Sequence, residues 1–550
     1  MGTKTDESFS FIPVSLKNIL DLVKNLKSKS SSGADLLSNT LLKASIHLLA
    51  EPLKLLFNLS LETGFVPSQI TIAKVIPLHK EGEKSSFNNY RPIAVISTIG
   101  KLLEKVIHQQ LSDFLNSQDI LTSSQFGFRA HHGVEHPLLL FANRVQNSLN
   151  NGKHNISVFI DLKKAFDTVN FQVLLRKLEH YGVRGKALKW FKNYLVRSQF
   201  VVVGGDVVSS ILSMLCGIPQ GTVLGPLLFL IFVNDFAFCT LLMSLLFADD
   251  CTLQGEGENL PHLILLMNEQ LVIAEKWFAA NMLTLNIKKP KYVIFHPTQP
   301  LPNSFTPPLS IGCNILDRVG SKQAESSVRF LGVLIDDKLL FKEHISKLKK
   351  KLSSSIFAIT SAKWNAPLRV RKAIYFSLFE SKLRFGVLLF GCAAESDLRD
   401  LEILQKKAIR HVACAFFLAH TEPIFQSLGI LKLKDLITLE RCTLVHKYKH
   451  GKLPIAFTAS FLTPIDVLSM SRREDPECYS LPPNNHPSTP RSPTSKLISS
   501  WNSLPHHLKT IGCIKVFKSS LRNFFLDSYT EMCSTPNCIS CSYQQSHPGH

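Results

Sequence analysis

Two acidic turns decide the fold class of this chain: Phe159-Ile160-Asp161-Leu162-Lys163-Lys164-Ala165-Phe166-Asp167 and Leu246-Phe247-Ala248-Asp249-Asp250-Cys251. Each turn follows a short run of apolar, β-rich residues, which predicts a buried strand. An aspartate placed directly after such a strand is costly to remove from water unless a partner compensates its charge. Asp161, Asp249 and Asp250 are therefore candidate ligands of a cation.

Mg²⁺ suits such a site because it takes oxygen ligands and keeps room for water and substrate phosphates. Carboxylates from two adjacent strands can hold two such ions about 4 Å apart, an arrangement used for phosphoryl transfer. An Asp-Asp pair is ordinary by itself, since most such turns are only solvated. The prediction therefore depends on what surrounds the pair.

A glycine-rich stretch lies between the two turns: Gly217-Ile218-Pro219-Gln220-Gly221-Thr222-Val223-Leu224-Gly225-Pro226. Its glycines allow the backbone of a nucleotide or template to approach closely, and Gln220 can hydrogen-bond a base or a sugar. Alone, a loop of this kind before a helix is usually structural. The order of the three segments is what makes the pattern specific.

In this order, the segments resemble the reverse transcriptases of non-LTR retrotransposons, the LINE-type group, and most of all the jockey and chicken-repeat kind. The resemblance runs from about residue 30 to residue 527. Further matching segments are residues 73–80, 88–93, 124–129, 285–289, 329–333, 501–505 and 517–518.

The resemblance implies an α+β fold of the right-hand polymerase type, with fingers, a palm built on an antiparallel sheet and a helical thumb, followed by a helical C-terminal extension. The expected units are an N-terminal helical extension (1–70), fingers and palm (71–335), thumb or connection (336–467), a Ser/Pro-rich linker (468–497), and a helical segment with a Cys/His tail (498–550).

Hydrophobic periodicity gives the expected elements independently of that resemblance. Helices are expected at 34–61, with Gly64 as the stop signal, and at 98–118, 163–181, 224–236 and 262–280. Strands are expected at 72–78, 156–160, 291–296 and 328–335, with two more around a turn at Asp249-Asp250.

By this resemblance, Asp161 and Asp249 would ligate two Mg²⁺ ions, and Asp250 would be a weaker ligand. The backbone carbonyl of Leu162 would complete one site. Mn²⁺ is the expected substitute for Mg²⁺.

Nucleotide recognition is expected from residues on both sides of the carboxylates. Phe166, five residues after Asp161, falls where the family places the ring that excludes a 2′-hydroxyl; the alternative is that it only fills core. Lys80 and Arg91 are the candidate triphosphate clamps. Gln220 and Gly221 would contact the nucleotide or template.

Lys289 is the candidate general acid for the leaving pyrophosphate, with Lys288 and Lys291 as competitors. Pro290 departs from the family pattern, in which Thr or Ser follows the lysine, and it restricts the backbone of Lys289. The expected primer grip is the hairpin turn Phe330-Leu331-Gly332.

The net charge of +20 favours a polyanionic partner. The expected partners are an RNA template, a DNA primer and deoxynucleoside triphosphates, with the basic helical region after residue 338 against the duplex. We expect no membrane span, because Asn234-Asp235 interrupt the apolar run at 224–247. Without a secretory signal, the expected location is intracellular, in the nucleus or the cytoplasm.

The C-terminal tail holds a candidate Zn²⁺ site at Cys533, Cys538, Cys541 and His547. Its irregular spacing favours a metal-free tail instead. Most other cysteines lie singly in apolar runs, as free thiols do in a reducing compartment.

Only about 70 residues precede the fingers segments, so we expect a fragment that lacks the endonuclease of LINE-type elements. Two alternatives remain: an RNA-dependent polymerase that makes RNA, and a decayed or domesticated nucleic-acid-binding protein without catalysis. The intact carboxylates argue against the second, whereas Pro290 and the expected lack of an endonuclease leave it open.

Overall fold

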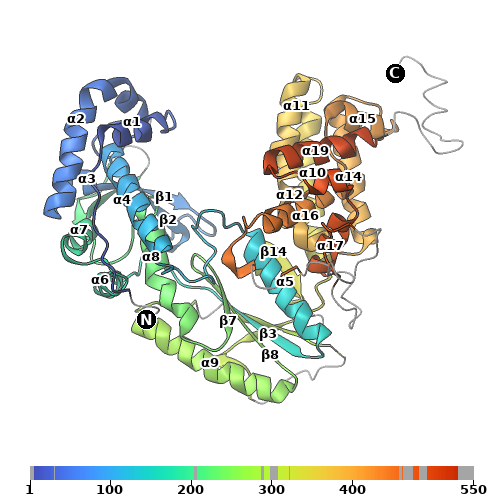
Figure 1. Ribbon diagram of the computed structural model, residues 1–550, viewed down its shortest axis with the longest axis horizontal. Coiled ribbons are helices and arrows are strands. Elements are labelled where there is room, and N and C mark those ends of the chain that lie inside the picture. Colours follow the sequence, from blue (N-terminus) through green and yellow to red (C-terminus); the bar gives the residue numbers. More distant parts are fainter. Residues whose placement is uncertain are drawn as a thin grey trace, which may run out of the picture.

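The structure is a computed structural model that describes residues 5–29, 31–203, 207–286, 290–297, 307–320, 323–457, 461–462, 475–481 and 492–529. These residues form a mixed α/β fold. Figure 1 shows an N-terminal lobe in blue and green and a C-terminal lobe in yellow to red, with a β-sheet between and below them.

The central sheet has five strands in the order β12-β9-β3-β8-β7. Their bounds are β3 (His154–Ile160), β7 (Met243–Phe247), β8 (Asp250–Gly257), β9 (Lys291–Phe295) and β12 (Asp317–Val319). β3 is the middle strand and runs antiparallel to both β8 and β9. All of its residues except His154 are buried, including the polar residues Asn155 and Ser157, and the other four are apolar.

Helices cover both faces of this sheet. α5 (Glu135–Asn150) packs on β3 and β7, and α9 (Leu260–Ala280) packs on β8 and β3. Successive residues of β3 contact the two helical layers alternately: Val158 and Ile160 belong to the core that includes α9, whereas Phe159 belongs to the core that includes α5. This is the two-residue period of a strand buried on both faces.

The N-terminal lobe is built on a second sheet in the order β2-β1-β4-β5, with β6 also paired to β4. Its strands are β1 (Ala73–His79), β2 (Tyr90–Ile96), β4 (Ser198–Val203), β5 (Val207–Val208) and β6 (Leu212–Ser213). Its helices are α1 (Leu16–Lys24), α2 (Asn39–Thr63), α3 (Ser68–Thr71), α4 (Thr98–Ser117), α6 (Phe171–His180) and α7 (Gly185–Leu195). Gly64 ends α2 in the left-handed region, at φ +68°, so the stop signal read from the sequence is confirmed.

The apolar run after the glycine-rich stretch forms α8 (Leu224–Val233), a short 3₁₀ segment, η2 (Asn234–Phe238), and then β7. Asp235 is buried and paired: Lys177 Nζ donates to its Oδ1 at 2.6 Å and to the Phe232 carbonyl at 2.6 Å. Among the described residues, no helix is long and apolar enough to cross a bilayer.

Three expected elements differ from the sequence-based prediction. The helix expected from residue 163 begins only at Phe171, because residues 163–170 form a loop bonded to other segments. The strand expected at 328–335 is a hairpin of β13 (Ser327–Phe330) and β14 (Val333–Asp336). The turn of the β7–β8 hairpin is Ala248-Asp249, and Asp250 is the first residue of β8.

The C-terminal lobe is helical. Its long helices are α10 (Lys342–Ser361), α14 (Glu395–Ala413), α16 (Leu433–Lys449) and α19 (Ile514–Asp527). Shorter elements are α11 (Leu368–Ile374), the π-helical η3 (Tyr375–Glu380), α12 (Ser381–Arg384), α13 (Val387–Phe390), α15 (Glu422–Leu428), η4 (Ile455–Phe457), α17 (Pro493–Asn502) and α18 (His506–Lys509).

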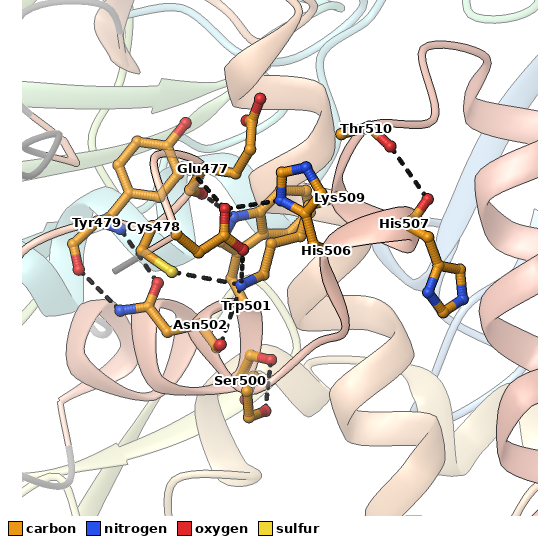
Figure 2. A network of polar contacts seen from close by, with 12 residues as sticks. Glu477, Cys478, Tyr479, Ser500, Trp501, Asn502, His506, His507, Lys509 and Thr510 are labelled. Carbon is orange, nitrogen blue, oxygen red and sulfur yellow. Dashed lines mark hydrogen bonds and ion pairs between the residues drawn. The ribbon is translucent and has the colours of Figure 1, made fainter. Parts of the chain in front are cut away.

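The end of the C-terminal lobe is held by a polar network around Trp501-Asn502 (Figure 2). The Trp501 indole donates to the Glu477 carbonyl at 2.7 Å, and the Asn502 side chain bonds both backbone groups of Tyr479. Buried Lys509 donates to Asp475 at 2.9 Å. Residues 475–481 therefore pack against this unit, and α17 begins at Pro493, inside the stretch expected to be a linker (468–497).

Candidate active site

The three acidic residues lie at one end of adjacent strands of the central sheet. Asp161 directly follows β3, and Ile160 pairs with Cys251 on β8, so Asp161 and Asp250 extend neighbouring strands. Asp249 is the second residue of the tight turn between β7 and β8. The sheet register thus brings together two segments that are almost ninety residues apart in sequence.

Asp161 is anchored by a segment that comes much later in the chain. The Asn286 side chain donates to Asp161 Oδ2 at 2.8 Å, and the Asn286 amide donates to the Asp161 carbonyl at 2.9 Å. The Lys163 amide donates to the Thr284 carbonyl at 2.9 Å. None of these bonds uses the carbonyl of Leu162, the backbone group expected at the metal.

Burial and neighbouring negative charges raise the pKa values of Asp249 and Asp250. Desolvation and the charges of Asp249 and Asp161 together raise the pKa of Asp250 to about 6. Burial also raises the pKa of Asp249, and Asp161 adds to this rise, whereas the cations Arg91 and Lys80 oppose it. Carboxylates held this close favour either a shared proton or a bound cation.

The donor set fits a hard divalent cation, since it consists of carboxylates beside backbone carbonyls. In the part of the chain that the structure describes, no three His, Cys, Asp or Glu side chains converge closely enough to enclose an ion by themselves. Mg²⁺ commonly binds through one or two carboxylates and takes its other ligands from water and phosphates. A Mg²⁺ ion at these carboxylates would therefore take its remaining ligands from water or phosphate oxygens.

The glycine-rich segment joins the first acidic turn through backbone bonds. The Ile218 amide donates to the Phe166 carbonyl at 2.7 Å, and the Gly217 amide to the Val169 carbonyl at 2.8 Å. Gln220 Nε2 donates to Asp167 Oδ1 at 3.1 Å. These bonds explain why residues 163–170 are not helical.

The same segment also contacts the N-terminal lobe. The Ala94 amide on β2 donates to the Gln220 carbonyl at 2.6 Å. Gly221 has φ +112°, and a Cβ there would lie 2.5 Å from the Ala94 carbonyl oxygen, so only glycine fits this approach. Lys80 directly follows β1, the strand paired with β2, and both Lys80 and Arg91 are exposed.

Phe166 has one face covered and remains partly exposed. Its ring stacks on the buried ring of Phe229 on α8, with centroids 4.3 Å apart and planes at 19°. The exposed ring of Phe128 meets it edge-on at 6.0 Å. These contacts fix the ring beside the carboxylate turn without closing it off from solvent.

Residues 78–335 match the family described as reverse transcriptase (RNA-dependent DNA polymerase). The chain is 27% identical over 440 residues to the probable RNA-directed DNA polymerase from transposon BS of Drosophila melanogaster. It is 26% identical over 442 residues to the RNA-directed DNA polymerase from mobile element jockey, and 24% identical over 413 residues to the probable enzyme from transposon X-element, both of the same fly.

Residues 78–335 form a reverse transcriptase domain of the LINE type. The alignments cover 76%, 77% and 73% of this chain, but only 47%, 46% and 44% of the three relatives. The chain thus spans less than half the length of these curated relatives. The family resemblance read from the sequence is confirmed.

The expected primer-grip residues of the reverse transcriptase domain lie at its C-terminal end, at the tip of the β13–β14 hairpin. Phe330 is buried, with its ring 5.0 Å from Phe141 and 5.5 Å from Phe159. Leu331 and Gly332 form the turn, with φ values of +46° and +88°. A Cβ on Gly332 would meet the ring of Phe385 at 2.8 Å.

Two residues of the reverse transcriptase domain support the site although no sequence pattern predicts a role for them. Asn286 lies within the matching segment 285–289. Buried Glu104 on α4 accepts hydrogen bonds from the two backbone amides at the start of α8, Val223 at 2.6 Å and Leu224 at 3.3 Å. It also accepts from the Arg197 side chain at 2.9 Å. An acidic residue on the apolar face of a predicted helix was the available signal.

Two groups of expected residues lie outside the described residues: Lys288 and Lys289, and the tail residues Cys533, Cys538, Cys541 and His547. Lys291, the other lysine considered as a general acid, lies on β9 and forms an ion pair with Glu325. Its charge is therefore already compensated.

Proposed function

We propose that the chain is an RNA-directed DNA polymerase that extends a DNA primer on an RNA template from deoxynucleoside triphosphates. The observation that supports this most is the position of three aspartates at neighbouring strand ends within a reverse transcriptase domain. The relatives are named RNA-directed DNA polymerases, and the net charge of +20 suits a nucleic-acid substrate.

In this proposal, Asp161, Asp249 and the Leu162 carbonyl hold two Mg²⁺ ions, with Asp250 as the weaker ligand. When bound, the ions supply charge stabilisation for the attacking and leaving oxygens. The raised pKa values of Asp249 and Asp250 support this assignment, because a cation would relieve the repulsion behind them. Mn²⁺ would take the same ligands.

The residues around the carboxylates would position the nucleotide. Lys80 and Arg91, whose charges reach Asp249, would neutralise the triphosphate. Gln220 and Gly221 would lie against the sugar or template, and Phe166 would exclude a 2′-hydroxyl. The primer 3′-hydroxyl would then attack the α-phosphate, with pyrophosphate as the leaving group.

The arrangement of the chain supports a right-hand polymerase. The sheet with β1 and β2 would be the fingers, the five-stranded central sheet the palm, and the helical lobe from α10 onward the thumb and its extension (Figure 1). The exposed lysines Lys347, Lys350 and Lys351 on α10 would face the duplex. Binding would therefore weaken steeply with salt.

Primer extension by the purified full chain tests the proposal. An RNA template with an annealed DNA primer is incubated with deoxynucleotides or ribonucleotides, each with Mg²⁺ or Mn²⁺. We expect extension with deoxynucleotides and either metal, and little with ribonucleotides. Asp161→Asn serves as the inactive control.

Each other outcome contradicts the proposal in a distinct way. Extension with ribonucleotides as the better substrate would indicate an RNA-dependent RNA polymerase. Absence of extension by folded protein that still binds the template–primer would indicate a nucleic-acid-binding protein without catalysis.

A further inference from the structure

Gln125 lies beside the turn that carries Asp249, and we propose that it is a positioning residue for this turn. The side chain accepts a hydrogen bond from the backbone amide of Ala248, the residue before Asp249. The inference rests on the proposed polymerase function, because its consequence is the placement of a metal ligand.

Residues 124–126 extend the edge of the central sheet. The Leu246 amide on β7 donates to the Ser124 carbonyl at 2.9 Å, and the Phe126 amide donates to the Leu246 carbonyl at 2.8 Å. Gln125 pairs with Leu246 in a parallel bridge. The segment is thus fixed to the strand that leads into the Asp249 turn.

The Gln125 side chain links this segment to the turn itself. It is only 2% exposed, and its Oε1 accepts from the Gly127 amide at 2.8 Å and from the Ala248 amide at 3.1 Å. Ala248 has φ +58°, a backbone region that residues with a Cβ rarely adopt. A turn in this conformation needs such outside support to stay in place.

Gly127 allows the backbone of residues 124–127 to approach the Ala248 turn closely. A Cβ at this position would lie 2.3 Å from the Ala248 nitrogen and 3.0 Å from the Phe247 carbonyl carbon. Any larger residue would have to push the turn away. The segment therefore holds Ala248 in two ways, by a hydrogen bond and by a close backbone contact.

The nitrogen of the Gln125 side-chain amide, Nε2, argues against a purely structural role. Within the described residues, no atom accepts from its buried Nε2. A buried donor without an acceptor destabilises the folded state, so an apolar side chain of similar shape would be tolerated here for packing alone. What the amide adds is the acceptor that fixes Ala248, and a small displacement of a reacting group slows catalysis strongly.

The test compares Gln125→Met with Gln405→Met. Gln405 is also buried and bonds backbone groups, accepting from Leu433 at 2.8 Å and donating to Leu431 at 3.0 Å, but it lies in the C-terminal lobe. Single-nucleotide addition, Mn²⁺ binding to the nucleic-acid-free protein by electron paramagnetic resonance, and hydrogen exchange of residues 246–251 are measured for both variants.

For Gln125→Met we expect a rate per folded molecule that falls about tenfold or more, with the KM for deoxynucleotide unchanged. Its Mn²⁺ midpoint should rise, and the Ala248 amide should exchange faster. Gln405→Met should change none of the three. Gly127→Ala, which displaces Ala248 from the other side, should reproduce the effect and serves if Gln125→Met does not fold.

A rate and a Mn²⁺ midpoint for Gln125→Met equal to those of Gln405→Met would overturn the inference. If the wild-type protein extends no primer, the proposed function fails by itself. The Mn²⁺ midpoint and the exchange of residues 246–251 would then still decide whether Gln125 positions the turn.

Discussion

Asp250, beside the strand ends, and Asp475, in the C-terminal lobe, are carboxylates in opposite electrostatic states. Desolvation and two like charges raise the pKa of Asp250 to about 6. Partial burial alone would also raise the pKa of Asp475, but hydrogen bonds from Lys509, the Glu477 amide and His506 lower it to about 2. One carboxylate thus lacks the compensation that the protein gives to the other.

The two regions use their polar groups differently. Around Trp501-Asn502, the protein supplies a partner for each group that the network joins (Figure 2). At the strand ends, the fold concentrates negative charge and leaves it beside solvent. Charged groups left for an external partner therefore indicate chemistry, whereas charged groups satisfied internally indicate a structural role.

The largest expected effect is that of Asp249→Asn. Primer extension should fall by on the order of 10³-fold or more, because the carboxylate that we propose as a metal ligand is lost. The thermal midpoint should not fall, since one of three repelling charges is removed. Extension by the variant at the wild-type rate would refute the role of Asp249, and a lower melting temperature would refute the repulsion.

Asp475→Asn should show the reverse pattern. Buried Lys509 would lose its carboxylate partner, so the C-terminal unit should lose about 2–4 kcal/mol of stability, while the rate per folded molecule stays unchanged. Hydrogen exchange of residues 495–509 measures the loss. Because the folded pKa of Asp475 is depressed, its contribution is complete above about pH 4 and should disappear as the pH falls towards 2; a loss that persists at pH 2 would contradict this.

A smaller effect is expected for Phe166, the aromatic residue beside the carboxylates, which differs in exposure from Trp501 in the C-terminal lobe. Phe166 keeps part of its ring accessible, whereas Trp501 is fully buried. Phe166→Val should therefore reduce the preference for deoxynucleotides over ribonucleotides by about tenfold, measured as the ratio of kcat/KM values. Unchanged selectivity with a lower melting temperature would show that Phe166 only packs against Phe229.

The smallest effect should come from His506→Gln. His506 Nδ1 lies 2.8 Å from Asp475 Oδ1, but its side chain is 59% exposed, and exposed ion pairs contribute little. Exchange protection of residues 495–509 should change by less than about 1 kcal/mol. A loss of exchange protection as large as that of Asp475→Asn would mean that the network depends on exposed His506 rather than on buried Lys509.

Local sequence patterns predicted the regular elements well because burial leaves a clear period. The mainly apolar run of β3, the glycine that ends α2 and the length of α9 could each be read from neighbouring residues. The expected helix at 163–170 was wrong because its backbone bonds go to Gly217, Ile218 and Thr284. Such distant partners leave no local period.

The candidate site shows the same contrast between features that neighbouring residues reveal and contacts that join distant segments. The carboxylates were predicted from their place after apolar runs, and the register of β3 and β8 brings them to adjacent strand ends. Glu104, Asn286 and the link from Gln125 to Ala248 were not predicted, since each bonds a group more than a hundred residues away in sequence. The roles of Lys80, Arg91 and Phe166 stay predictions.

The hydrogen bond between Ala94 and Gln220 couples the movement of β2 to that of the Gln220 turn. Because the Ala94 amide on β2 donates to the Gln220 carbonyl, and no side chain fits between the two segments at Gly221, a displacement of β2 must carry the Gln220 turn with it. Arg91 lies on the same strand. A nucleotide that drew this strand inward would therefore meet the Arg91 guanidinium and the Gln220 side-chain amide in one movement. Recognition of its phosphates and of its sugar or base would then be a single kinetic step.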